Sequence, residues 1–223
     1  MFYDTKTNNH GLPHDPFKAI VSPRPIGWVS TVSNDGVVNL APYSFFNAVS
    51  DVPPMVMIAS NQRKDTLTNI ESNGEFVCSM ATYDLHQAMN MSSAFVDKSV
   101  DEFRLAKLES APSSSVKPPR VAASPASLEC RLWQVLPIPK SIDDNTDSDY
   151  KLILGFVVGV YINDDFIADG LFDSAKAQLI ARMGYMDYGR LSAENIFSLN
   201  RPIPSEDRLD ATLIPGPWDG TYR

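Results

Sequence analysis

The sequence predicts a single, mainly β domain, an antiparallel barrel with short peripheral helices. Two observations support this fold class. Short apolar runs separated by turn residues repeat between residues 26 and 60, and longer apolar runs follow at 128–138 and 152–162. A chain of 223 residues with 43% apolar content can bury one complete core. We therefore expect one domain over residues 1–223, with a proline-rich C-terminal arm at 200–223.

The first predicted strands form a hairpin. Residues 26–32 and 37–41 are apolar runs on either side of Asp35-Gly36, a pair typical of a turn with a positive φ at the glycine. Two more strands are expected at 44–49 and 55–60, where Pro53 and Pro54 suit a corner because they cannot donate to a central ladder. Four strands so close together predict a meander.

Short helices and further strands follow. Residues 65–72 have helical spacing with Asn73-Gly74 as a stop, 75–80 read as a strand, and 84–91 as a weak helix. Ser99 and Glu102 form a capping-box start for a short helix ending near 108. The strands at 128–138 and 152–162 are expected to complete the same barrel. The acidic loop 143–149 lacks the glycine and distal glutamate of an EF-hand, so we expect it to be solvated.

Charge and composition exclude several functions. The net charge of −8 and the absence of a basic block argue against nucleic-acid binding. No apolar leader and no membrane-length apolar run are present, so a soluble, cytoplasmic protein is expected. Cys78 and Cys130 fit a reduced, buried pair. His10, His14 and His86 are too scattered for a metal site, and none is predicted.

The stretch 23–76 combines apolar aromatics, hydroxyls and a basic helix start, a mixture that suits a planar ring joined to an anion. Lys64-Asp65-Thr66 is the candidate phosphate anchor, because a helix start offers unpaired N–H groups and Lys64 adds a charge. Ser60 and Arg63 could assist. The alternative is an ordinary helix start, with Asp65 accepting helix N–H bonds and Lys64 in solvent.

Two strand segments are candidates to line the ring. Alternation places Ser44 and Phe46 on one strand face and Phe45 and Asn47 on the other, and only one face can line a pocket. In the first hairpin, Trp28 and Ser30 share a face beside Thr31. The alternative is that these aromatics are core residues, with Ser30 a strand filler.

Several of these motifs resemble one known family. Pro23-Arg24-Pro25-Ile26-Gly27-Trp28-Val29-Ser30-Thr31, residues 39–47, Pro53-Pro54 and Lys64-Asp65-Thr66 are similar to the flavin reductase-like, FMN-binding split-barrel proteins. The resemblance implies a Greek-key-like split barrel that binds FMN near a homodimer interface, with Ser44–Asn47 and the Trp28–Thr31 strand along the flavin. Arg182 begins a segment similar to one that returns near the flavin in this family. Many members carry a histidine where this chain has Tyr161.

The resemblance implies a flavin-dependent oxidoreductase. Hydride from NADH or NADPH would reduce FMN, and the electrons would pass to a downstream acceptor, which could be a protein. No catalytic residue is assigned, because the cofactor performs the difficult step. One alternative is a flavoredoxin-like electron carrier without NAD(P)H oxidation. The other is a non-enzymatic β-barrel interaction module with an acidic surface.

Overall fold

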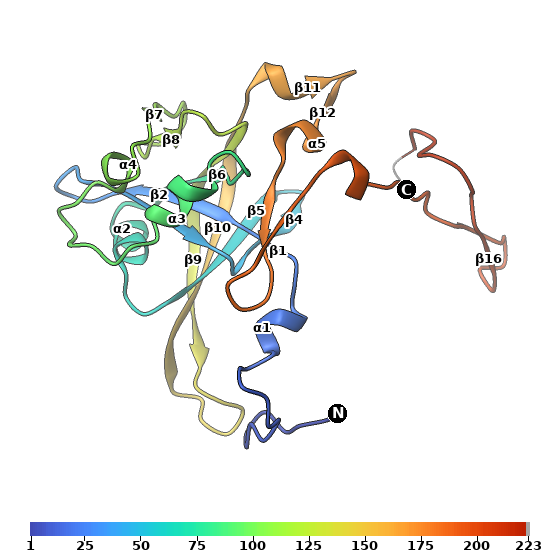
Figure 1. Ribbon diagram of the computed structural model, residues 1–223, viewed down its shortest axis with the longest axis horizontal. Helices are drawn as coiled ribbons and strands as arrows, with labels where there is room; N and C mark the ends of the chain where they lie inside the picture. Colours follow the sequence, from blue (N-terminus) through green and yellow to red (C-terminus); the bar gives the residue numbers. More distant parts are fainter. Residues whose placement is uncertain (222–223) are drawn as a thin grey trace.

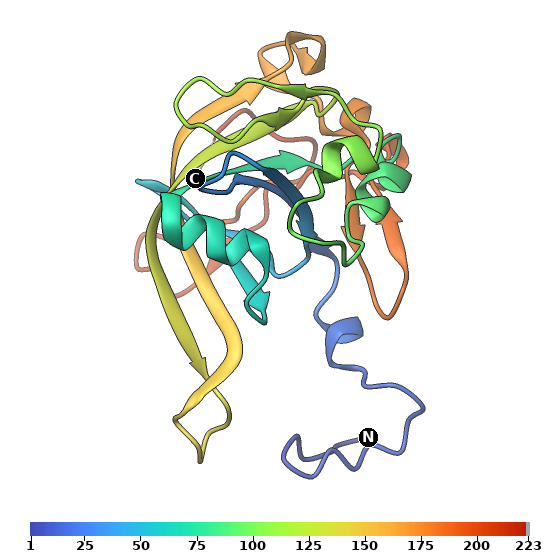
Figure 2. The ribbon, with the colours of Figure 1, turned by 90° about the vertical axis from the view of Figure 1, so that its left-hand side faces the viewer.

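The computed structural model describes residues 1–221 as a rolled antiparallel sheet with short helices beside it and an extended segment at each end of the chain (Figures 1 and 2). The helices are α1 (Phe17–Ile20), α2 (Asp65–Asn73), α3 (His86–Met91), α4 (Glu102–Leu105) and α5 (Ser174–Ala177), with 3-10 turns η1 (Asp164–Phe166) and η2 (Ala193–Asn195).

The other regular elements are strands. The strands are β1 (Arg24–Pro25), β2 (Gly27–Val32), β3 (Val38–Tyr43), β4 (Phe46–Asp51), β5 (Pro54–Asn61), β6 (Glu75–Met80), β7 (Ser110–Ala111), β8 (Arg120–Val121), β9 (Ala126–Pro139), β10 (Asp147–Ile162), β11 (Ile167–Ala168), β12 (Leu171–Phe172), β13 (Ile180–Arg182), β14 (Tyr188–Arg190), β15 (Ile203–Pro204) and β16 (Ala211–Thr212).

One sheet of seven strands dominates the fold, in the order β3-β2-β6-β9-β10-β5-β4. The expected meander over the first four strands is therefore wrong. The β2–β3 and β4–β5 hairpins lie at opposite ends of the sheet, with β6, β9 and β10 between them. Hairpin signals specify only local pairs, whereas the order of the pairs depends on contacts between distant segments.

The first hairpin forms as predicted. Gly36 has φ +82° and Ser33 N donates to Val37 O at 2.8 Å, which closes the turn between β2 and β3. The helix stop is also confirmed, because Gly74 is left-handed at φ 70° and its N–H donates to Ile70 O at 2.8 Å.

The two faces of the sheet carry separate cores. On β2, Val29 belongs to the cluster inside the barrel, whereas the neighbouring Trp28 belongs to a second cluster under α3 and α4, as strand alternation requires. Inside the barrel, a Cβ on Gly155 would lie 2.5 Å from the Phe76 ring. The ring therefore occupies the space that a side chain at residue 155 would need. α2 packs on the same core through Leu67 and Ile70.

Two long strands complete the same sheet, as expected, but extend further than predicted. β9 and β10 form a hairpin that projects from the body (Figure 2, yellow), and β10 includes part of the loop expected to be irregular at 143–149. Two predicted boundaries also change. The strand expected from residue 44 begins at Phe46, and the helix expected from Ser99 begins at Glu102, where Asp101 Oδ1 accepts from Phe103 N at 2.9 Å.

The C-terminal segment lies apart from the sheet, and Figure 1 shows it extending to the right of the body. It contains the small β15–β16 hairpin. Within residues 1–221, no helix has the length and hydrophobicity needed to cross a membrane.

Candidate functional site

A cavity of about 350 Å³ lies at the start of α2, and we call it the α2 pocket. Four segments form it: residues of β3, the loop before α2 with the first turn of that helix, the chain after α3, and the first residue of α4. Its lining residues are Asn39, Ala41, Pro42, Tyr43, Gln62, Arg63, Lys64, Asp65, Thr66, Ser92, Ser93, Ala94, Phe95, Val96 and Glu102.

The start of α2 carries no side-chain cap. Lys64 is the N-cap residue in an extended conformation, and Thr68 N donates to Lys64 O at 3.0 Å as the first helical bond. Asp65 is the first residue of the helix and accepts no capping hydrogen bond, so the ordinary capped start that we considered from the sequence is not what forms. Backbone N–H groups at an uncapped start, together with the helix dipole, attract an anion.

Two cationic side chains lie beside this helix start, and one of them is already in an ion pair. Arg63 forms an ion pair with Glu71 at 2.6 Å. Lys64 Nζ lies 5.1 Å from the centroid of the Phe95 ring and has no ion pair among the described residues. Lys64 is thus the cation that remains available to a ligand in the α2 pocket.

Two buried hydroxyls lie close together here, that of Tyr43, which lines the pocket, and that of Ser60, which does not line it. Neither Tyr43 Oη nor Ser60 Oγ has a well-aligned hydrogen-bond partner within residues 1–221, although both are shielded from solvent. Burial raises the pKa of Tyr43, the adjacent hydroxyls of Thr66 and Ser60 oppose that rise, and Asp65 adds to it. Unsatisfied buried hydroxyls are uncommon, and at a pocket they indicate a place for a polar ligand group.

A buried polar network fixes the pocket wall. Glu102 accepts from Asn39 Nδ2 at 3.1 Å and from Leu40 N at 3.0 Å, and Asn39 Oδ1 accepts from Thr66 Oγ1 at 2.8 Å. Burial raises the pKa of Glu102, and nearby Asp65 contributes in the same direction. Thr66 was expected to offer its hydroxyl to an anion, but the network already uses its proton. Thr31 joins the network by accepting from Asn69 Nδ2 at 3.0 Å.

The β2 residues proposed from the sequence do not line the α2 pocket. Trp28 has no exposed surface, and its Nε1 donates to Ser92 Oγ at 2.9 Å. Ser30 is equally buried and donates to the Pro119 carbonyl. Trp28 is a core residue, one of the two interpretations that the sequence left open. Through Ser92 it holds the segment that follows α3 against the pocket.

The other residues proposed from the sequence lie outside the α2 pocket. Ser44 sits in a bend, and the Phe45 ring lies 6.3 Å from the Tyr150 ring. Asn47 is exposed, and its Oδ1 accepts from Ala48 N. Arg182 donates to the Tyr188 hydroxyl at 2.5 Å, with its guanidinium 4.6 Å from that ring.

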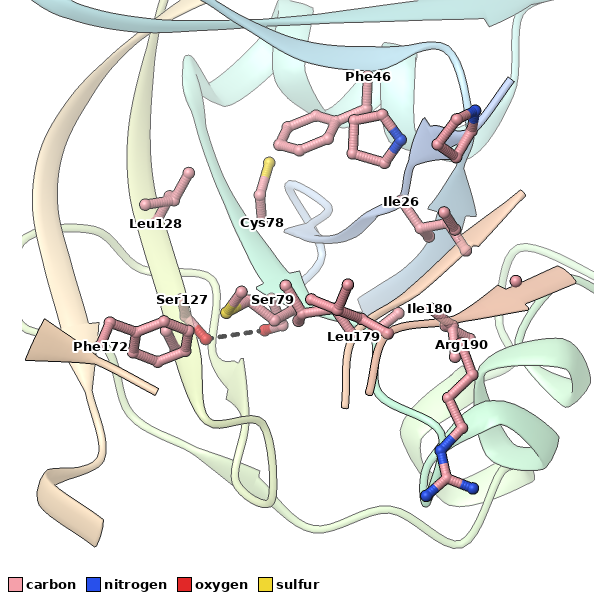
Figure 3. Close-up of a pocket in the computed structure, with 18 of the residues that line it drawn as sticks. Ile26, Phe46, Cys78, Ser79, Ser127, Leu128, Phe172, Leu179, Ile180 and Arg190 are labelled. Carbon is pink, nitrogen blue, oxygen red and sulfur yellow. Dashed lines mark hydrogen bonds between the residues drawn. The ribbon is translucent and has the colours of Figure 1, made fainter. Parts of the chain in front are cut away.

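Phe46 lines a second, larger cavity of about 690 Å³, which we call the apolar groove. Figure 3 shows Phe46 and Ile26 on one side of it and Leu128 and Phe172 on another. Ser127 Oγ donates to Ser79 Oγ at 3.1 Å within the groove, and Arg190 extends its guanidinium away from it. The apolar lining offers few groups for hydrogen bonding to a ligand.

Sequence reasoning assigned no site role to several residues that form the α2 pocket. Asn39 and Tyr43 belonged to a recognised motif, but only the rolling of the sheet brings β3 and β5, and with them the hydroxyls of Tyr43 and Ser60, next to one another. Glu102 was noticed only as a helix-start residue, and no local signal marked Phe95. Among the described residues, no cluster of three or more metal-ligating side chains occurs.

A rolled seven-stranded antiparallel sheet with this peripheral helix defines the class of split-barrel proteins. The chain belongs to the flavin reductase-like family, because residues 21–178 match the model of the flavin reductase like domain. Family members share a flavin-binding split barrel. The class and the family expected from the sequence motifs are thus confirmed.

The chain is also similar to individual proteins. An uncharacterized protein of Aquifex aeolicus is 34% identical over 181 residues, which cover 78% of this chain and 88% of the relative. Nitrilotriacetate monooxygenase component B from Bacillus cereus has a similar structure, with a TM-score of 0.78, 28% identity and coverage of 89% of this chain and 98% of the other. An FMN-binding protein from Thermus thermophilus shares the fold, with a TM-score of 0.69, 19% identity and coverage of 89% and 99%.

Proposed function

We propose that this protein is an FMN-dependent oxidoreductase that accepts hydride from NADH or NADPH and passes electrons to a downstream acceptor. The observation that carries the proposal is the uncapped start of α2 beside Lys64, with the buried Tyr43 hydroxyl in the lining of the same pocket. A phosphate monoester with a polyhydroxyl chain supplies the negative charge that Lys64 and the helix N–H groups attract, and hydroxyl groups that can bond to the buried hydroxyl.

Different residues of the pocket would contact different parts of the cofactor. Lys64 and the first N–H groups of α2 would hold the phosphate, and Arg63 would contribute if it left Glu71. Tyr43 would bond to a polar atom of the ribityl chain, with Ser60 beside it outside the pocket lining, while Ala41, Pro42 and Phe95 offer apolar surface for the ring. Bound FMN supplies the hydride and electron transfer. Asp65 opposes an anion by like charge, so its carboxylate would have to face away.

Glu102 has a positioning role in this proposal. Glu102 fixes Asn39 and the backbone of Leu40, and Asn39 in turn fixes Thr66 in the first turn of α2. This chain of bonds holds the phosphate-facing N–H groups in place before a ligand arrives. Preorganised N–H groups bind an anion with less loss of conformational entropy.

Anaerobic mixing of FMN-loaded protein with NADH and, separately, with NADPH tests the proposal. Loss of the oxidised flavin absorption with at least one nucleotide is the expected result. Protein that keeps its flavin but is bleached only by a chemical reductant would be an electron carrier. Purified protein that takes up no FMN would contradict the proposed function altogether.

A further inference from the structure

Another cavity, of about 340 Å³, lies between α3 and the β13–β14 hairpin, and we call it the β14 pocket. Met89 and Ile180, which are almost completely buried, give it an apolar part, and Gln87 and Asn90 add two carboxamides. None of the described residues that line it carries a carboxylate, although 27 residues of the chain are acidic. A pocket without carboxylates in so acidic a chain favours a ligand with negative charge.

Arg190 is the arginine of this pocket, and Figure 3 shows its guanidinium directed away from the apolar groove. Its Cζ lies 4.2 Å from the centroid of the Tyr83 ring, and that ring lies 5.0 Å from the His86 ring at 21°, so three flat groups are stacked. Within residues 1–221 the Arg190 side chain forms no ion pair and no hydrogen bond. Glu194 interacts with it electrostatically but lines a neighbouring cavity. The stack thus orients a guanidinium whose N–H groups are available to a ligand.

A second arginine contacts a residue that lines the pocket. The Arg182 guanidinium lies 4.6 Å from the centroid of the Tyr188 ring and donates to the Tyr188 hydroxyl at 2.5 Å. Arg182 forms no ion pair with a carboxylate among the described residues either. Two arginines without carboxylate partners raise the positive potential around one pocket, which favours a ligand with more than one negative charge.

These groups fit a phosphorylated adenosine. The edge of a guanidinium bonds to phosphate oxygens through two N–H groups, while its face stacks on a planar ring. Carboxamides such as those of Gln87 and Asn90 match the donor and the acceptor on the edge of adenine. The cavity volume is in the range of small-molecule sites. A small carboxylate would use the arginine but leave the carboxamides and the stack without a partner.

The β14 pocket adjoins the α2 pocket. Asn90 in α3 lines the first, and Ser92, two residues later, lines the second. α3 has six residues and is therefore about 9 Å long, a distance that an extended dinucleotide spans.

We propose that the β14 pocket binds the adenosine half of NADPH, with Arg190 on its 2′-phosphate, while the nicotinamide reaches the flavin in the α2 pocket. This inference rests on the proposed function. NADH lacks the 2′-phosphate, so the protein prefers NADPH.

Binding of two nucleotide fragments tests the site without any hydride transfer. Adenosine 2′,5′-bisphosphate and adenosine 5′-monophosphate differ only by the 2′-phosphate, and FMN-loaded full chain is titrated with each in a calorimeter. The bisphosphate should bind at least about tenfold more tightly, and Arg190→Ala should remove this advantage, because a charge-assisted hydrogen bond is lost. The ratio of kcat/KM for NADPH to that for NADH should fall by a similar factor.

Arg104→Ala is the matched control. Arg104 is an exposed arginine that lines neither the α2 pocket nor the β14 pocket, so its removal should change neither affinity. Circular dichroism checks that each variant is folded, and Arg190→Lys replaces Arg190→Ala if the latter is not, because an ammonium lacks the stacked fork of the guanidinium.

The outcomes separate this inference from the proposed function. Equal affinities of the natural chain for the two fragments, or an unchanged affinity of Arg190→Ala for the bisphosphate, would overturn the inference, even if both NADH and NADPH bleach the flavin. Tight binding of the bisphosphate that depends on Arg190, without bleaching by NADPH, would support the pocket and contradict the proposed function.

Discussion

Lys64 is the residue whose side chain most directly tests the α2 pocket. Replacing it with alanine should weaken FMN binding by about 1.5–3 kcal/mol, the usual contribution of a charge-assisted hydrogen bond, or roughly 10- to 150-fold. Riboflavin lacks the phosphate, so its affinity should change much less. Fluorescence titration of both ligands measures the difference.

Lys98→Ala is the matched control for this substitution. Lys98 is a lysine on the neighbouring surface that lines a different cavity and does not line the α2 pocket. Its removal should leave the affinities for FMN and riboflavin unchanged. Equal losses for the two ligands in Lys64→Ala would show that the phosphate binds elsewhere.

Glu102 gives the protein a pH dependence of stability. Because its pKa is raised above the ordinary 4.5 in the folded chain, ionisation destabilises the fold: the cost is absent below the unfolded pKa and complete above the folded one. The stability of the natural chain relative to Glu102→Gln should therefore fall as pH rises through this window. Urea unfolding of both proteins at a series of pH values measures it, and a constant difference would contradict the prediction.

At the level of elements, the missing side-chain cap lowers the stability of α2 but leaves its first N–H groups available to a ligand. Serine at Lys64 would supply the side-chain cap that is missing, and N-cap hydroxyls contribute about 0.5–2 kcal/mol. Flavin-free Lys64→Ser should therefore unfold at higher urea than Lys64→Ala, since the two differ only by the hydroxyl. Both should bind FMN weakly. Equal midpoints would mean that the N–H groups are already satisfied.

The individual elements were more predictable than their arrangement. Asp35-Gly36 and Asn73-Gly74 carry turn and helix-stop chemistry within a few residues, so their positions follow from local sequence. The insertion of β6, β9 and β10 between the two hairpins depends on packing inside the barrel, for example of Phe76 against Gly155. No local pattern contains that information.

The same distinction applies to the site. The helix start at Lys64 was recognisable because charge, position and helix signal coincide within three residues. Phe95 and Glu102 reach the pocket from about 30 and 40 residues further along the chain, so only the folded structure brings them there. Trp28 and Ser30 are residues for which local sequence was not enough. Strand alternation predicts that they share a face, but it does not say whether that face meets a ligand or the core.

For the molecule as a whole, the proposed chemistry requires no histidine. His10 accepts from Leu12 N, His14 lies 5.7 Å from the Tyr185 ring, and His86 stacks on Tyr83 at 5.0 Å. None of them lines the α2 pocket. Each His→Ala variant should therefore change single-turnover flavin reduction by less than about tenfold. A loss of about a hundredfold, the scale of a missing acid or base, would contradict a mechanism based on positioning.

The separation of the two hairpins in the sheet also has a consequence for biosynthesis. β5 pairs with β4 at once, but its other neighbour is β10, and Asn61 faces Tyr150, 89 residues later in the chain. At ordinary translation rates the ribosome needs on the order of 5–20 s to make that stretch. Throughout this interval we expect the nascent β4–β5 hairpin to present an unpaired edge, with Val56 and Ile58 uncovered. Such an edge is prone to pairing with other chains, so a chaperone that covers it would be useful at this stage.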